Sequence, residues 1–164
     1  MKKLLVLRHA KADPDDGSVS DHERALTKKG TKAARKMGEL LRERRLIPDR
    51  VLRSTAERAR TTAEAAVEGL GQAVAIQTVA ELYLAEPPAY LDVLKRLGDD
   101  VTQVLVVGHN PGIETLLYHL TSRAEHMPTA ALAECDLPLE RWSDLAPTTH
   151  GELVNVWRPK EINE

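Results

Sequence analysis

Apolar and polar positions along the chain follow two spacings. Short continuous apolar runs, typical of buried strands, alternate with longer segments whose apolar residues recur every three or four positions, as in amphipathic helices. The predicted strands cover residues 4–7, 51–54, 73–79, 101–108, 130–137 and 152–157. The predicted helices begin at residues 27 and 57 and cover residues 90–97 and 112–120. This alternation predicts an α/β fold with a mostly parallel sheet, in which the last two strands are antiparallel edge strands.

The first apolar run, L-L-V-L, ends abruptly at Arg8 and His9. A secretory signal needs roughly 7 to 15 apolar residues before its cleavage site, so this run is too short for one. A buried strand whose end emerges at the sheet edge explains the pattern better. The run V-L-V-V-G ends in the same way at His109. Because the carboxyl ends of parallel strands share one edge, we expect His9 and His109 to be neighbours.

Composition narrows the possible classes of protein. A chain of 164 residues fits one domain over residues 1–164. The net charge of -2 provides no basic field for nucleic acid, and no apolar stretch is long enough to span a membrane. Cys135 is the single cysteine, which excludes an intrachain disulfide and a cysteine-based zinc site. A reduced, cytoplasmic location is therefore expected.

Four short motifs occur in order along the chain. They are L-R-H-A, L-T-K-K-G, S-T-A-E-R-A-R-T-T-A and V-V-G-H-N-P-G. Together they resemble the histidine phosphatase superfamily, and the short length is similar to its small SixA-type phosphohistidine phosphatases. The resemblance covers residues 3–135 in outline. It implies a phosphoglycerate mutase-like, three-layer α/β/α sandwich with a mostly parallel central sheet, a phosphorylated histidine intermediate, and no metal or cofactor.

The resemblance also implies roles for individual residues. His9 corresponds to the nucleophile, Arg8 and Arg58 to the phosphate-binding arginines, and His109 to the second pocket histidine. A neutral imidazole offers a lone pair for attack, and two guanidinium forks bind phosphoryl oxygens without losing their charge. Many members protonate the leaving oxygen with a carboxylate after the third strand. Glu81 is the nearest match and is therefore a candidate general acid.

Some residues near these motifs have more than one interpretation. Arg24 lies in a D-x-x-R-x-L-T pattern that resembles the small members, and it is either a substrate-binding residue or a solvated surface arginine. Arg53 and Thr55 depart from the family's usual Ser-Pro-Ala motif. Arg53 either adds positive potential at the pocket rim or pairs with a nearby acid. Ser54 and Thr55 are predicted to cap the helix that begins near Glu57.

Other acidic residues and histidines are predicted to have no catalytic or metal-binding role. The acidic residues of the first long loop are predicted to be solvated rather than to bind a cation, because they lack a metal-binding spacing; they are Asp13, Asp15, Asp16 and Asp21. The remaining histidines are predicted to be structural or surface residues: His22, His119, His126 and His150.

The length of the chain bears on its substrate. Larger relatives that act on sugar phosphates carry long insertions that wall the pocket, and this chain has no room for them. The sequence therefore favours a monomeric phosphatase that removes phosphate from histidine on a protein, such as a phosphocarrier or a kinase phosphotransfer domain, with no nucleic acid or membrane partner. Two alternatives stay open: a phosphatase of a small phosphorylated metabolite, and a non-catalytic phosphate-binding module.

Overall fold

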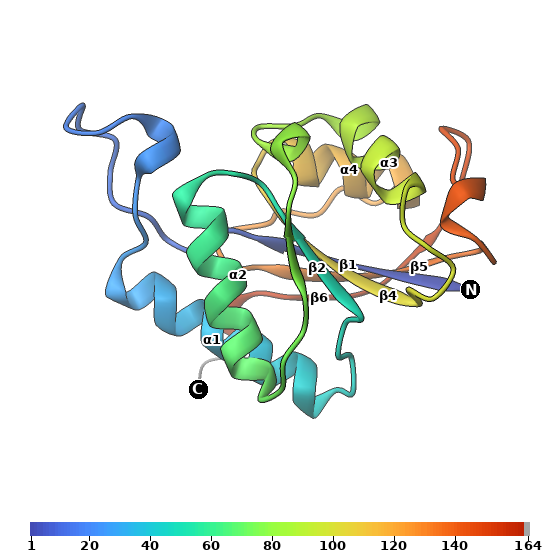
Figure 1. Cartoon of the computed structure of the whole chain (residues 1–164), viewed down its shortest axis with the longest axis horizontal. Helices are drawn as coiled ribbons and strands as arrows, with labels where there is room; N and C mark the ends of the chain where they lie inside the picture. The colour runs from blue at the N-terminus through green and yellow to red at the C-terminus, as the bar shows by residue number, and fades with distance from the viewer. Residues whose placement is uncertain (163–164) are drawn as a thin grey trace.

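A six-stranded sheet runs through the middle of the molecule, with helices on both faces (Figure 1). The computed structural model describes residues 1–162. The strands are β1 (Lys2–Arg8), β2 (Arg50–Arg53), β3 (Ile76–Thr78), β4 (Gln103–Gly108), β5 (Leu132–Leu137) and β6 (Glu152–Trp157). The helices are α1 (Lys28–Glu43), α2 (Glu57–Leu70), α3 (Pro87–Lys95), α4 (Gly112–Thr121) and α5 (Pro159–Ile162). Three short 3-10 turns complete the elements: η1 (Asp21–Glu23), η2 (Ala80–Leu82) and η3 (Trp142–Asp144).

The side chains of β1 supply both layers of the core. Leu4 and Val6 face the side that α3 and α4 cover, whereas Leu5 and Leu7 face the side of α1 and α2. In Figure 1, α3 and α4 lie above the sheet and α1 lies below it. All four β1 side chains are fully buried, because a strand covered on both faces has no solvent side. The predicted three-layer α/β/α sandwich is therefore confirmed.

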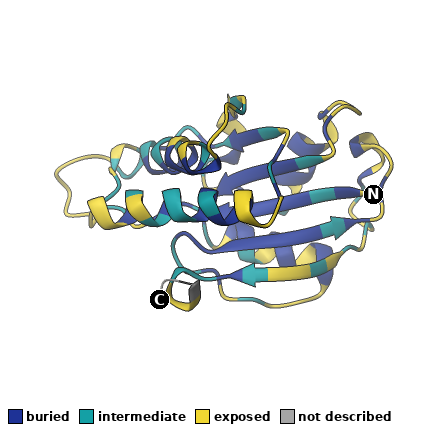
Figure 2. Cartoon of the chain, turned by 90° about the horizontal axis from the view of Figure 1, so that it is seen from below, coloured by how far each residue is buried: buried dark blue, intermediate teal, exposed yellow. Residues whose placement is uncertain are grey.

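The strand order is β3-β2-β4-β1-β5-β6, and the first four of these strands are parallel to one another. Strands β5 and β6 are antiparallel to their neighbours, as predicted. The prediction that both are edge strands was wrong for β5, which lies between β1 and β6. Its run L-A-E-C-D-L is buried along most of its length, which suits an interior strand. Strand β6 lies at the edge of the sheet, and most of its residues are exposed or half-buried (Figure 2).

Helices α1 and α2 pack together with their backbones in close approach. A Cβ atom added at Gly38 of α1 would lie 1.9 Å from the carbonyl oxygen of Ala66. One added at Gly69 of α2 would lie 2.1 Å from the carbonyl oxygen of Arg35. Both distances are far below van der Waals contact, so only glycine fits at these two positions. This contact sets the position of α2 along α1.

Helix α3 begins at the Pro87-Pro88 pair, which the sequence indicates as its start, and its buried apolar residues follow from Tyr90. Proline suits the first helical position because its backbone angle is already set and no hydrogen-bond donor is needed there. Of the helices described in residues 1–162, none is long and apolar enough to cross a membrane.

Candidate active site

Two histidines meet where β1 and β4 end. Arg8 pairs with Gly108 in the parallel register, so His9 and His109 follow at the same edge of the sheet. The backbone N–H of His9 donates to the Gly108 carbonyl at 3.1 Å. The ring centroids of His9 and His109 are 5.3 Å apart. The expectation that the two histidines are neighbours is confirmed.

Arg58 reaches this edge from the first turn of α2. Strand β2 ends at Arg53, next to β4, and the chain then turns into the helix. Arg58 is only 3% exposed. Its positive charge is close enough to contribute to lowering the pKa of both His9 and His109. The structure therefore brings together Arg8, His9, Arg58 and His109. The first and last of these residues are about a hundred positions apart in the sequence.

The protonation state of His9 follows from its surroundings. Its Nδ1 donates a hydrogen bond to the Ala10 carbonyl at 2.8 Å, which places the proton on Nδ1. Burial, followed by the charges of Arg58 and Arg8, lowers the pKa of His9 to about 4. The ring is therefore neutral near pH 7. Within residues 1–162 no group hydrogen-bonds to Nε2, whose lone pair is free to attack an electrophile.

His109 is held by a serine rather than by a backbone carbonyl. Its Nε2 lies 2.6 Å from the hydroxyl oxygen of Ser54. Burial, followed by His9 and Arg58, lowers the pKa of His109 to about 3. This ring is also neutral near pH 7, so the two histidines do not repel each other.

The predicted role of Ser54 and Thr55 as helix caps was wrong. The N-cap of α2 is Ala56, which has no capping side chain. The Ser54 hydroxyl is directed to His109, and the Thr55 hydroxyl bonds His22 Nε2 at 2.7 Å. Both hydroxyls therefore contact histidine rings instead of capping the helix.

Several buried donors of the cluster lack an acceptor. Among the described residues, no partner is found for Nε of Arg8, Nε of Arg58 or Nδ1 of His109. Leaving a buried polar group without a hydrogen bond costs about 1–3 kcal/mol. An anion with several oxygens would satisfy donors from different sides at once. A phosphoryl group has that chemistry.

Comparisons with known proteins agree with this geometry. The family model of the histidine phosphatase superfamily (branch 1) matches residues 4–83, a span that contains Arg8, His9 and Arg58. An uncharacterised protein of Mycobacterium tuberculosis is 34% identical over 152 residues, which cover 86% of this chain and 92% of the relative. The chain belongs to the histidine phosphatase superfamily.

Solved structures of this superfamily indicate which type of histidine phosphatase the chain is. A protein assigned as phosphohistidine phosphatase SixA from Nakamurella multipartitia superposes with a TM-score of 0.85 and is 29% identical, with 96% of each chain covered. The protein histidine phosphatase SixA complexed with tungstate gives a TM-score of 0.83 at 25% identity, covering 98% of this chain and 99% of that one. This histidine phosphatase is therefore of the SixA type, as the motifs predicted.

A carboxylate of the phosphatase contacts the site from an unexpected place. Asp21, in η1, accepts hydrogen bonds at Oδ2 from Arg58 Nη2 (3.1 Å) and from the Tyr83 hydroxyl, and at Oδ1 from Arg24 Nη1 (2.9 Å). The Tyr83 hydroxyl and the two guanidinium groups hold the pKa of Asp21 well below its usual range. The prediction that Asp21 is merely solvated was wrong, because these three donors bind it.

Tyr83 and His22 line the same side of the site. The Tyr83 ring stands edge-on to His109, with centroids 5.6 Å apart, and edge-on to His22 at 4.9 Å. The interpretation of His22 as an ordinary surface residue was therefore incomplete, since it bonds Thr55 and packs on Tyr83. Neither residue was a candidate from the sequence.

Glu81 is not brought to the cluster. It lies in η2, where Leu82 is buried in the core and Glu81 is turned to the surface. Its Oε2 pairs with Arg96 Nη2 at 2.7 Å, and its side chain is 53% exposed. The Arg96 pair lowers the pKa of Glu81. In this arrangement Glu81 has no contact with His9 or His109 through which it would deliver a proton.

The two arginines whose roles were left open both lie near the site. Arg24 bonds Asp21 through Nη1 and the Asp13 carbonyl through Nε, and its charge contributes to lowering the pKa of His9. Arg53 donates to the Ser54 carbonyl at 3.1 Å. Arg24 therefore adds positive charge near the nucleophile, whereas Arg53 supports the turn that precedes α2.

Arg8 is held from the opposite side by a network around Glu114. Arg8 Nη1 donates to the Met127 carbonyl at 3.1 Å, and the Met127 N–H donates to Glu114 Oε2 at 2.7 Å. Asn110 Nδ2 donates to both Glu114 and the Met127 carbonyl at 2.9 Å. The charge of Glu114 also favours the protonated form of Arg8, although burial lowers the Arg8 pKa. This network fixes the direction of the Arg8 guanidinium.

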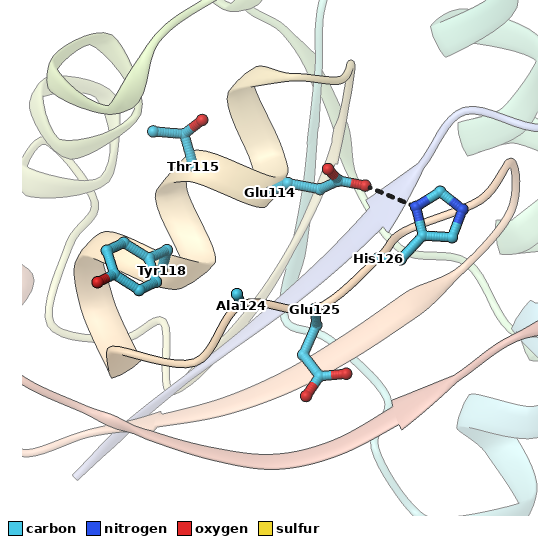
Figure 3. Close-up of a pocket in the computed structure, with 6 residues that line it drawn as sticks. All are labelled: Glu114, Thr115, Tyr118, Ala124, Glu125 and His126. Carbon is cyan, nitrogen blue, oxygen red and sulfur yellow. Dashed lines mark ion pairs between the residues drawn. The ribbon is translucent and has the colours of Figure 1, made fainter.

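An open hollow lies beside this network, between α4 and residues 124–126 (Figure 3). Glu114 and His126 point toward one another across it, with Glu114 Oε2 and His126 Nδ1 3.3 Å apart. Its lining residues are Glu114, Thr115, Tyr118, Ala124, Glu125 and His126. Neither His9 nor His109 lines the hollow, and Glu114 belongs both to its lining and to the network around Arg8. Within residues 1–162, no group of three or more histidine, cysteine, aspartate or glutamate residues is arranged to hold a metal ion.

Proposed function

We propose that this chain is a metal-independent phosphohistidine phosphatase that removes phosphate from histidine on a protein. His9 is the nucleophile in this proposal, and Arg8, Arg58, His109 and Arg24 bind the phosphoryl group. The observation that supports it most is the state of His9, which is neutral, carries its proton on Nδ1 and has a free Nε2 next to donors that lack an acceptor. A histidine with only a structural role would have no need of this arrangement.

The proposed chemistry proceeds in two steps. Nε2 of His9 attacks phosphorus, and the bond from phosphorus to the leaving group breaks, so that the phosphoryl group is carried on His9. Water then attacks phosphorus, the bond from phosphorus to Nε2 of His9 breaks, and inorganic phosphate leaves with His9 again neutral and free. Arg8 and Arg58 stabilise the charge on the phosphoryl oxygens, and preorganised charges of this kind supply most of the catalysis in phosphoryl transfer.

Two features favour phosphohistidine as the substrate. Transfer from one imidazole to another exchanges like for like, so the first step is close to thermoneutral. The solved structures that this chain resembles include one named as a protein histidine phosphatase and others assigned as phosphohistidine phosphatases. The monomeric state and the cytoplasmic location rest on the sequence and stay predictions.

Rapid quenching with labelled substrate tests the proposal. The phosphate label should appear on His9, in a linkage that acid cleaves and base does not, and His9→Ala should abolish turnover. Label on a serine, threonine or aspartate would contradict the mechanism. In parallel, kcat/KM is measured on phosphohistidine proteins and on a panel of phosphorylated metabolites. A metabolite turned over far faster than any phosphohistidine protein would favour a metabolite phosphatase, and no turnover at all would favour a binding module.

A further inference from the structure

Asp21 is a carboxylate at the rim of the site, and it has no role in the two-step chemistry proposed above. Its side chain is 36% exposed although three donors bind it. Oδ2 takes two of those donors, from Arg58 and Tyr83. Among the described residues Oδ1 takes one, from Arg24, and so keeps a lone pair for a further donor.

The position of Asp21 is on the side of the site formed by Tyr83 and His109. Its backbone carbonyl accepts from Arg58 Nη1 at 2.7 Å, and its carboxylate accepts from the hydroxyl of Tyr83, whose ring stands edge-on to His109. The charge of Asp21 acts on the pKa of His109, whereas the charge of Arg24 acts on that of His9. Asp21 therefore lies at the partly exposed rim of the site, on the side of Tyr83 and His109.

The chemical state of Asp21 decides what it can do there. Two guanidinium groups and a phenol bind the carboxylate, which keeps it ionised throughout the pH range in which enzymes are assayed. An ionised carboxylate accepts a hydrogen bond and has no proton to give. This is the opposite of the general acid that an alkyl phosphate ester requires, because an alkoxide must be protonated as it leaves.

Resting on the proposed function, we infer that Asp21 determines specificity for phosphohistidine by accepting the N–H of the substrate's phosphorylated imidazole. That ring departs easily only when its distal nitrogen is protonated. His9 Nε2 then forms a bond to phosphorus, the phosphorus to nitrogen bond breaks, and its electron pair stays on the departing nitrogen. The ring leaves as neutral imidazole with its own proton still on the distal nitrogen. A negative oxygen beside that N–H favours the reactive form, whereas it repels a developing alkoxide.

A comparison of two substrates tests the inference. One is a synthetic peptide that carries phosphohistidine, and the other is p-nitrophenyl phosphate, whose leaving group departs as an anion. Asp21→Asn should lower kcat/KM for the peptide by about tenfold or more relative to p-nitrophenyl phosphate, since hydrogen bonds to charged groups are of that strength. The alkaline limb of the pH profile for the peptide should also move to lower pH. Asp15→Asn removes the same charge from an exposed position of the same loop and should leave the ratio unchanged.

Each other outcome has a definite meaning. An equal fall on both substrates would overturn the inference and make Asp21 a positioning residue for Arg58. A rise on both would overturn it as well, because the carboxylate would then merely compete with the phosphoryl group for the arginines. Asp21→Ser is measured in the same way if circular dichroism shows that Asp21→Asn does not fold. Failure of the proposed function is a separate result, seen when the parent protein itself hydrolyses no phosphohistidine.

Discussion

The hydroxyl of Ser54 holds His109 in a single tautomer. Its oxygen lies 2.6 Å from Nε2 of His109 and also accepts the backbone N–H of Ala56 at 3.3 Å. Because Ser54 is fully buried, its hydroxyl hydrogen needs an acceptor, and Nε2 is the one in reach. The proton of the neutral ring is then on Nδ1, which becomes a donor for a phosphoryl oxygen.

We therefore expect Ser54→Ala to lower kcat/KM by about tenfold, because a buried hydrogen bond that selects the tautomer is lost. The steady-state kinetics of the parent and the variant give the measurement. Thr61→Ala is the matched control, since among residues 1–162 its hydroxyl bonds the Glu57 carbonyl alone, within α2. Equal effects of the two variants would mean that Ser54 contributes to stability alone.

Arg58 should not tolerate replacement by lysine. Arg58→Lys keeps the charge but loses the planar fork, and we expect kcat/KM to fall by about a hundredfold or more, as when one preorganised donor is removed. Arg60→Lys, two residues along α2, changes a half-buried arginine that pairs with Glu57 and Glu64 and should have little effect. Near-normal activity of Arg58→Lys would remove Arg58 from the phosphate-binding residues.

The acid limb of the pH profile should reflect the lowered pKa of His9. Protonation of Nε2 removes the nucleophile, and the folded ring protonates only near pH 4. We expect kcat/KM for p-nitrophenyl phosphate, corrected for ionisation of the substrate, to stay level as pH falls through the ordinary histidine range and to decline only near pH 4. A decline centred near pH 6.5, the value of a free imidazole, would show that His9 is not shielded as the structure indicates.

Glu81→Gln should leave both substrate types unaffected. Glu81 pairs with Arg96 on the surface, and an exposed pair of this kind contributes little, so kcat/KM should stay within about threefold of the parent. The measurement uses a phosphohistidine peptide and an alkyl phosphate side by side. A loss of about a hundredfold on the alkyl phosphate alone would restore Glu81 as a general acid.

Chelation should also have no effect. The proposed pocket neutralises the phosphoryl charge with guanidinium groups, so the rate with EDTA should equal the rate without it. Activity that vanishes with EDTA and returns with magnesium or zinc would contradict the metal-free mechanism.

The main site could be predicted from the sequence because its residues stand at the ends of recognisable elements. His9 and His109 each end an apolar run, and Arg58 opens a helix after another. The position of β5 in the sheet was harder to predict, because an antiparallel strand late in the chain can be added at an edge or inserted next to β1. The continuous apolar run A-A-L-A was the available signal that both of its faces are covered.

The residues around Asp21 could not be predicted in the same way. Asp21 and Arg58 are separated by 37 positions, and Asp21 and Tyr83 by 62, so their pairing depends on how a polar loop folds back over the sheet edge. The spacing of apolar residues along the sequence does not indicate such a contact. Two weak signals were present: Asp21 shares the D-x-x-R pattern with Arg24, and Tyr83 is two residues beyond Glu81 in V-A-E-L-Y-L. The local motif pointed to Glu81, which η2 turns to the surface, where it pairs with Arg96.

The glycine contact between α1 and α2 has a consequence for genetics. Gly69 and Arg58 are at opposite ends of α2, about 16 Å apart along the helix axis. A methyl group at Gly38 or Gly69 would push the helices apart, because backbone atoms on the other helix leave it no space. The displacement would travel along a rigid helix and move the Arg58 guanidinium away from the sheet edge, and small misplacements of a catalytic group cost large factors in rate. A random mutagenesis screen for loss of phosphatase activity would thus recover substitutions at these two glycines as well as at the pocket residues. The glycine substitutions would lie where α1 and α2 pack together, away from the substrate.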